Sequence, residues 1–169
     1  FYDIIIAGDV MNYQLVETEQ DRKDIEIMAS IIWPITYKEI LTPQQIKYML
    51  NKFLSCDSIA EAIRDGFTFV LLLDNEKNKL GFMSYKLNRD KIFLSKLYLL
   101  PNAQNKGYAS QAMEYLKSYK LPIELTVNKN NKNAYEKYLH LGFKVTDSVV
   151  TDIGNAYYMD DYVMQLKAN

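Results

Sequence analysis

The residues best suited to chemistry lie in one run, from residue 97 to residue 110. Residues 97–100 form an apolar strand pattern that stops at Pro101, and a short loop containing Gly107 then leads into a helical pattern. The first N–H groups of a helix lack intrahelical partners, and the helix dipole adds partial positive charge there, so such a turn holds an anion largely by its backbone. Gly107 lets that backbone come close to a ligand. The run therefore predicts an anion site.

The charges around this turn indicate that the anion is a ligand. Helix N-termini usually carry Asp or Glu, because a carboxylate fits the dipole. No acidic residue occurs from residue 91 to residue 113, whereas Lys91, Lys96 and Lys106 do. Two common nucleotide loops are excluded, because the Walker loop needs two glycines before Lys-Ser/Thr and the dinucleotide fingerprint needs three, while this loop has one.

In the N-terminal third, capping residues and hydrophobic spacing predict one strand and three helices. The strand covers residues 12–17, and Thr18 opens the first helix. Thr42 caps the second helix, which has proline at its first position. Ser58 is followed by a glutamate at the capping-box spacing, so it is expected to open a third helix, which Gly66 ends.

From residue 67 onward the pattern changes to strands with two helices between them. The strands are expected at residues 67–73, 79–86, 91–100, 122–127, 143–150 and 157–166, and the helices at residues 107–119 and 131–141. Short polar turns make the first three strands an antiparallel meander. The helix at 107–119 connects its two flanking strands by a crossover, which makes that pair parallel. The predicted fold class is therefore α+β (mixed α/β), with a mixed sheet.

The composition limits the class of protein. A chain of 169 residues fits one domain, residues 1–169, with residues 1–11 interpreted as an N-terminal extension. Its 20 basic and 21 acidic side chains are balanced and dispersed, which argues against a nucleic-acid partner. Neither a signal peptide nor a stretch of membrane-spanning length is recognisable, so no membrane partner is expected. The oligomeric state stays open, with a homodimer as one option.

Cysteine and histidine usage excludes several kinds of site. Cys56 is the only cysteine, which excludes an internal disulfide framework and multi-cysteine zinc sites and fits a reducing, cytoplasmic location. His140 is the only histidine, and no Ser or Cys nucleophile pattern surrounds it, so it is interpreted as a surface helix residue and not as part of a triad. No clustered ligands occur, so no metal is expected.

Two motifs resemble those of the GCN5-related N-acetyltransferase (GNAT) family. Gln104-x-x-Gly107-x-Ala109 is similar to the family's acyl-CoA pyrophosphate loop, Arg/Gln-x-x-Gly-x-Gly/Ala. The family's later motif follows in the expected order and separation, as Val127-x-x-x-Asn131-x-x-Ala134-x-x-x-Tyr138-x-x-x-Gly142-Phe143. The resemblance implies the GNAT fold, a central twisted mixed seven-stranded sheet with helices on both faces and strands that splay at the acyl-CoA site.

The resemblance also implies how acetyl-CoA, the expected cofactor, is held. The backbone of residues 97–99 would bond the pantetheine arm as a further strand would, and the loop at 105–110 would cradle the pyrophosphate. Asn131 would bond the cofactor arm, although it is equally well placed to be a simple helix N-cap. The residues so assigned are Leu97, Tyr98, Leu99, Gln104, Asn105, Lys106, Gly107, Tyr108, Ala109, Ser110 and Asn131.

For catalysis the resemblance implies that Tyr138 assists departure of the CoA thiolate, with packing in the core as the alternative. A thiol has a pKa of about 8.5 and a tyrosine about 10, so complete proton transfer is uphill by about 2 kcal/mol. Tyr138 is therefore expected to stabilise the thiolate by a hydrogen bond, unless the site lowers its pKa. Some family members carry a glutamate base on the preceding strand, but Thr126 stands there in this chain.

Four residues are candidates for the acceptor site. Trp33 and Tyr37 lie where this fold usually builds its acceptor pocket, or they are packing residues. Asp160 and Asp161, at the start of the last strand, are expected to bind a cationic amine or relay its proton, or else to be solvated. Glu124 is a weaker option for the same task.

The sequence thus favours an acetyl-CoA-dependent N-acetyltransferase, an acyltransferase in which a primary amine attacks the thioester directly in a ternary complex. The absence of a glutamate at Thr126 motivates an alternative, a non-catalytic acyl-CoA-binding or regulatory module with the same fold. A nucleotide-binding protein that uses the same helix terminus is a third reading. The acceptor stays open among polyamines, antibiotics, metabolites and protein N-termini.

Overall fold

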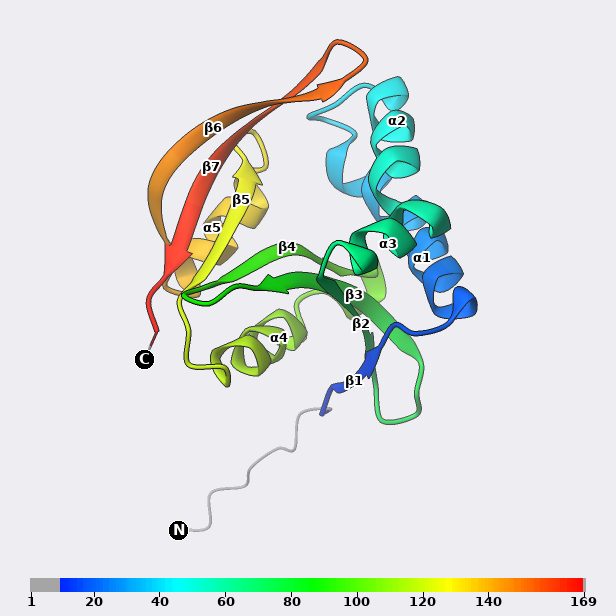
Figure 1. The fold of residues 1–169 in the computed structure, drawn as a ribbon, viewed down its shortest axis with the longest axis vertical. Coiled ribbons are helices and arrows are strands. Elements are labelled where there is room, and N and C mark those ends of the chain that lie inside the picture. Colours follow the sequence, from blue (N-terminus) through cyan, green and yellow to red (C-terminus); the bar gives the residue numbers. More distant parts are fainter. Residues whose placement is uncertain (1–9, 169) are drawn as a thin grey trace.

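The computed structural model describes residues 10–168, which form a single seven-stranded sheet with helices around it (Figure 1). The strands are β1 (Asn12–Leu15), β2 (Phe67–Leu73), β3 (Lys79–Leu87), β4 (Ile92–Leu99), β5 (Ile123–Asn128), β6 (Lys144–Gly154) and β7 (Tyr157–Leu166). The helices are α1 (Glu19–Tyr37), α2 (Pro43–Leu54), α3 (Cys56–Arg64), α4 (Tyr108–Lys117) and α5 (Lys132–His140), with a short 3₁₀ turn at Pro101–Ala103.

The strand order is β1-β2-β3-β4-β5-β7-β6, and β4–β5 is the parallel pair that the crossover predicts. This pair is short, because Ile92 faces Ile123 and Leu94 faces Leu125, and no pairing continues beyond Leu94. The two strands then diverge and leave a V-shaped opening in the sheet (Figure 1). The predicted mixed sheet with splayed strands is therefore confirmed.

Helices cover both faces of the sheet because the buried strands alternate their side chains between two cores. In β2, Phe69 and Leu71 pack with α1–α3, whereas Val70 and Leu72 pack with α4 and α5. The side chains of residues 69–73 are all buried, as expected for a strand covered on both faces. Figure 1 shows α1–α3 and α4 on opposite sides of β2–β4.

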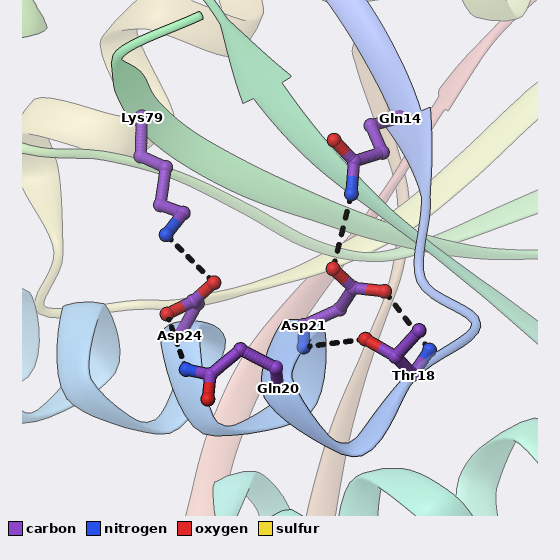
Figure 2. A network of polar contacts seen from close by, with 6 residues as sticks. All are labelled: Gln14, Thr18, Gln20, Asp21, Asp24 and Lys79. Carbon is purple, nitrogen blue, oxygen red and sulfur yellow. Dashed lines mark hydrogen bonds and ion pairs between the residues drawn. The ribbon is translucent and has the colours of Figure 1, made fainter.

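The first helix begins at the predicted cap (Figure 2). The Thr18 hydroxyl accepts a hydrogen bond from the backbone N–H of Asp21 at 3.1 Å, and the Asp21 carboxylate accepts one from the backbone N–H of Thr18 at 2.9 Å. Asp21 also accepts from the Gln14 side chain at 3.0 Å, which ties α1 to β1. An ion pair between Lys79 and Asp24, at 2.7 Å, links α1 to β3. These contacts fix α1 against β1 and β3 of the sheet.

The second cap is also confirmed, but the third is wrong. Thr42 accepts a hydrogen bond from the backbone N–H of Gln45 at 3.2 Å and opens α2. The third helix begins at Cys56, because Ser55 has extended backbone and its hydroxyl accepts from the backbone N–H of Ser58 at 3.2 Å. Ser58 is thus the third residue of α3, and the cap is Ser55, three residues earlier.

At the N-terminus, Met11 is buried in the core shared by α4 and the sheet. Its backbone N–H donates to the side-chain oxygen of Gln111 at 2.9 Å, so Met11 packs as part of the fold. Residues 1–9 of the predicted extension lie outside the described residues. Within residues 10–168, no helix is both long and apolar enough to cross a bilayer.

Candidate active site

A cavity of about 470 Å³ lies at the opening between β4 and β5. Its walls come from α1–α3 on one side and from α5, β6 and β7 on the other. It brings together predicted site residues from four elements that are distant in sequence, namely α1, β4, α5 with its N-cap, and β7. These residues are Trp33, Tyr37, Leu97, Tyr98, Asn131, Tyr138 and Asp161. Leu99 lies outside the lining of this cavity, at the end of β4.

A β-bulge shapes the β4 wall of the cavity. Ser84 of β3 faces Lys96, but Tyr85 faces Leu94, so Ser95 is the extra residue between them. Because β4 has no partner strand on the β5 side after Leu94, backbone groups along that edge face the opening. Buried backbone N–H and C=O groups require partners, so this edge is suited to an extended ligand that pairs as a strand does.

The other edge of β4 is held by an unusually close approach of β3. Gly81 lies opposite Leu99, and a Cβ added at Gly81 would stand 2.1 Å from the carbonyl oxygen of Tyr98. Only glycine fits there. The position of β4, and therefore of its free edge, depends on this contact.

Tyr37 and Tyr98 join α1 to the β4 wall. Their hydroxyls lie 2.9 Å apart, and the ring of Trp33 packs 5.2 Å from that of Tyr37 and 5.8 Å from that of Tyr98. Burial raises the pKa of both tyrosines, so both hydroxyls stay protonated at neutral pH. The indole N–H of Trp33 is buried and has no hydrogen-bond partner among the described residues. This wall therefore offers donors to a ligand.

Tyr138 reaches the cavity from α5, with its ring 5.4 Å from that of Phe143. Burial, together with the nearby Tyr37, raises the pKa of Tyr138. The site therefore does not lower this pKa, and complete proton transfer from Tyr138 to a thiolate is less favourable than for a free tyrosine. Within residues 10–168 no protein group accepts a hydrogen bond from its hydroxyl, so the hydroxyl is free to donate to a ligand.

Asn131 both caps a helix and lines the larger cavity, which are the two settings considered for it. Its side-chain oxygen accepts from the backbone N–H of Ala134 at 3.2 Å and caps α5, and Asn131 also lines the cavity. Thr126 lines the same wall from β5. The next paired strand, β7, places Asp161 opposite Asn128, two residues beyond Thr126.

The structure separates the two adjacent aspartates. Asp160 is exposed and forms an ion pair with Lys129 at 2.6 Å, outside the cavity lining. Asp161 lines the cavity, and one of its carboxylate oxygens is buried without a partner among the described residues. Burial, and secondly the charge of Asp160, raise the pKa of Asp161 to about 6. Glu124 is ion-paired with Lys91 at 2.8 Å and lies away from the cavity lining.

A second cavity, of about 330 Å³, lies at the N-terminus of α4, where the anion site is predicted. Gly107 precedes α4 with φ +82°, no side chain caps this helix, and its first turn contains no acidic residue. The Gln104 side chain donates to the Leu99 carbonyl at 3.1 Å and closes the loop. The predicted residues that line it are Leu99, Gln104, Asn105, Gly107, Tyr108, Ala109 and Ser110. Lys106 is exposed and outside the lining.

Two positively chargeable side chains of this second cavity were not predicted from the sequence. Lys137 and His140 line it from the last turns of α5. His140 is exposed, as predicted, and one ring nitrogen lies 2.7 Å from the Glu136 carbonyl. Their spacing of three residues on α5 places them on one helix face, but only the tertiary packing brings that face to the start of α4.

The comparisons with known proteins agree with this geometry. Residues 37–157 match the family model described as the acetyltransferase (GNAT) domain. An uncharacterized N-acetyltransferase of Mycobacterium bovis is 27% identical over 150 residues, which cover 85% of this chain and 96% of the relative.

Solved structures share the fold. The PaiA N-acetyltransferase of Thermoplasma acidophilum, in complex with coenzyme A, superposes with a TM-score of 0.75 at 22% identity, over 95% of this chain and 99% of that one. The spermidine N-acetyltransferase of Vibrio cholerae, solved with CoA and spermine, superposes with a TM-score of 0.66 at 19% identity, over 92% of this chain and 94% of that one. With a family model that spans most of its length, this chain belongs to the GNAT acetyltransferase family.

Proposed function

We propose that this protein is an acetyl-CoA-dependent N-acetyltransferase that transfers an acetyl group to a primary amine by direct attack in a ternary complex. One observation carries the proposal: β4 connects the two cavities. Leu99 lines the smaller cavity, whereas Leu97 and Tyr98 line the larger one. An extended donor that pairs with the free edge of β4 would place its phosphates at the start of α4 and its thioester beside Tyr138.

The smaller cavity suits the pyrophosphate of CoA. The uncapped N–H groups at the start of α4 and the ammonium of Lys137 present positive charge to one space, with Ser110 as a further donor. We assign Gln104 to closing the loop, because its side chain is already bound to the Leu99 carbonyl. Lys106, which is exposed outside the lining, contributes at most long-range charge.

In the larger cavity the amine nitrogen attacks the thioester carbonyl, a C–N bond forms and the C–S bond breaks. The backbone N–H groups along the free edge of β4 polarise the carbonyl. Tyr138 donates a hydrogen bond to the departing thiolate and keeps its own proton, because its pKa is raised. The thiolate is thus stabilised without a proton transfer from tyrosine.

The amine must lose a proton, and we assign its acceptance to Asp161, the carboxylate in the lining of the larger cavity. Deprotonating a lysine-like amine of pKa about 10.4 at pH 7 costs about 4.6 kcal/mol, against about 1 kcal/mol for an α-amine. Asp161 binds the ammonium and relays its proton to water. It lies on β7, next to the β5 strand on which Thr126 replaces the glutamate of some family members. This carboxylate favours catalysis over a non-catalytic acyl-CoA-binding module.

The test is to incubate the purified chain with acetyl-CoA and a mixture of amines, and to measure acetylated products and free thiol. The expected result is one free CoA for each N-acetylated amine, with no acetyl group left on the protein. Binding of CoA without any acetylated amine would instead establish the non-catalytic module. Tighter binding of ATP than of CoA would establish the nucleotide-binding protein.

A further inference from the structure

Lys96 is a half-buried lysine that has no carboxylate partner among the described residues. It lies on β4 two residues before Tyr98, so both side chains face the same side of the sheet, toward the larger cavity. Its ammonium lies 3.0 Å from the Ser95 hydroxyl and 5.9 Å from the centre of the Phe69 ring. Among residues 10–168 it makes no ion pair with an acidic side chain.

Two further polar groups of the cavity are donors. Lys52 lines it and donates to the Ile153 carbonyl at 2.6 Å, and the buried indole N–H of Trp33 has no acceptor among the described residues. Asp161 is the one carboxylate in the lining, and it pairs with neither lysine. The cavity therefore holds an unpaired cation and an unpaired carboxylate that do not neutralise each other.

A polycationic acceptor fits this wall poorly. A polyamine carries two or more positive charges, whereas the lining offers one carboxylate and two lysines. Like charges a few ångströms apart in a cavity of low effective dielectric repel by several kcal/mol. Burial already lowers the pKa of Lys96 to about 8, so a second positive charge beside its ammonium would be further disfavoured.

We propose that the acceptor is a zwitterionic amine whose anionic group is bound by Lys96 while Asp161 binds its ammonium. The inference rests on the proposed function and names its substrate class: small molecules or chain ends that carry a carboxylate or phosphate as well as a primary amine. The N–H of Trp33 is a second donor for the anion. Charge-assisted hydrogen bonds from a buried ammonium are stronger than neutral ones, so this contact selects among amines.

The test compares amines that differ only in the anionic group. The probes are leucine and leucinamide, 6-aminohexanoate and 6-aminohexanamide, and phosphoethanolamine and ethanolamine, with spermidine as the polycation. The anionic member of at least one pair should be acetylated with a kcat/KM 10-fold or more above its neutral partner and above spermidine. The first two pairs test a carboxylate as the anion, and the third pair tests a phosphate.

Lys96→Met then tests the residue itself. For the anionic acceptor we expect a 10- to 100-fold rise in acceptor KM, with kcat and the KM for acetyl-CoA within about twofold. Lys86→Met is the matched control, because Lys86 also lies over a phenylalanine ring, at 5.3 Å from Phe67, but outside the cavity lining. Trp33 is the sole tryptophan, so its fluorescence reports acceptor binding to the CoA-loaded protein without turnover.

Each outcome decides one claim. Equal kcat/KM within every pair, or faster acetylation of spermidine than of any anionic amine, overturns the inference and leaves the proposed function in place. Unchanged acceptor KM in Lys96→Met removes Lys96 as the anion-binding residue. Acetylation of no amine at all overturns the proposed function, and the inference with it. Folding is not a concern for this variant, since methionine removes a cation that is costly to bury.

Discussion

The Tyr37 hydroxyl lies 2.9 Å from the Tyr98 hydroxyl, across 61 residues of sequence. This hydrogen bond joins the last turn of α1 to β4 at the point where β4 has lost its β5 partner. One wall of the larger cavity is thereby fixed to the strand proposed to bind the donor. This contact would therefore couple the positions of the two proposed substrates.

Tyr37→Phe removes this contact and keeps the ring. We expect a loss of about 1 kcal/mol in free energy of unfolding, from the broken hydrogen bond, and a several-fold lower kcat/KM for the acceptor. Tyr119→Phe is the matched control, because Tyr119 and Tyr85 form a second hydroxyl pair at 2.9 Å, outside the cavity lining. A similar kinetic loss in both variants would mean that the effect is one of stability alone. Urea unfolding and steady-state kinetics measure the two quantities.

Tyr138→Phe tests the hydrogen bond to the thiolate. Loss of one donor to a developing negative charge should lower kcat by about 100-fold, with the KM for acetyl-CoA within about twofold. Because the pKa of Tyr138 is raised, the activity of the parent should show no decline from tyrosine ionisation up to pH 10. Tyr135→Phe, on the same helix with its ring 5.3 Å from Tyr162, is the control. Equal kcat in Tyr138→Phe and the parent would remove this role.

Asp161→Asn should make acetyl transfer at least 10-fold slower, because the amide neither attracts an ammonium nor accepts its proton. In the parent, kcat/KM should fall as the pH drops through about 6, where Asp161 becomes protonated. Asp160→Asn should keep most activity and shift this acid-side fall in kcat/KM to lower pH, because the charge of Asp160 raises the pKa of Asp161. If the parent and Asp160→Asn lose activity at the same pH, the fall in kcat/KM reports the protonation of a group other than Asp161.

Asp161 should also lower the free energy of unfolding at neutral pH. Its pKa of about 6 in the folded chain exceeds the ordinary 3.8, so the folded chain binds this proton more tightly than the unfolded chain does. The free energy of unfolding therefore falls as the pH rises from about 4 to about 6. Asp161→Asn avoids this fall, so it should be more stable than the parent at pH 7, and the difference should disappear below pH 4. Thermal melts across this range measure the effect.

The contrast between Asp160 and Asp161 shows what a sequence can predict. Strand alternation requires that two adjacent residues point to opposite faces, so one of the pair could face a cavity, but the pattern does not say which. The choice depends on which face of β7 the cavity lies against, and that cavity is built by elements distant in sequence, among them α1–α3, β4 and α5. Local signals such as the Thr18 cap were predicted correctly, because a cap depends only on the next few residues.

Lys96 shows the same limit in the donor strand. From sequence it was one of three lysines near an acid-free turn, and only Lys106 of the three was assigned to the phosphate loop. In the structure Lys96 lines the larger cavity, whereas Lys137 of α5 lines the predicted anion site. The bulge at Ser95 and the packing of α5 decide which lysine lines which cavity. Neither feature leaves a residue pattern that a single sequence reveals.

Gly81→Ala tests whether the position of β4 controls donor binding. The added Cβ would stand 2.1 Å from the Tyr98 carbonyl oxygen, so β4 must move away from β3. Overpacking of this kind costs about 2 kcal/mol, and we expect the KM for acetyl-CoA to rise at least 5-fold.

Gly66→Ala is the control for this variant. Gly66 has φ +90°, so alanine is strained there, but it lies after α3 and outside both cavity linings. It should lose stability without a change in the KM for acetyl-CoA. If both alanine variants raise this KM equally, donor binding follows global stability. If only Gly81→Ala does, the KM reports the position of the free edge of β4, because no side chain that lines either cavity has been changed.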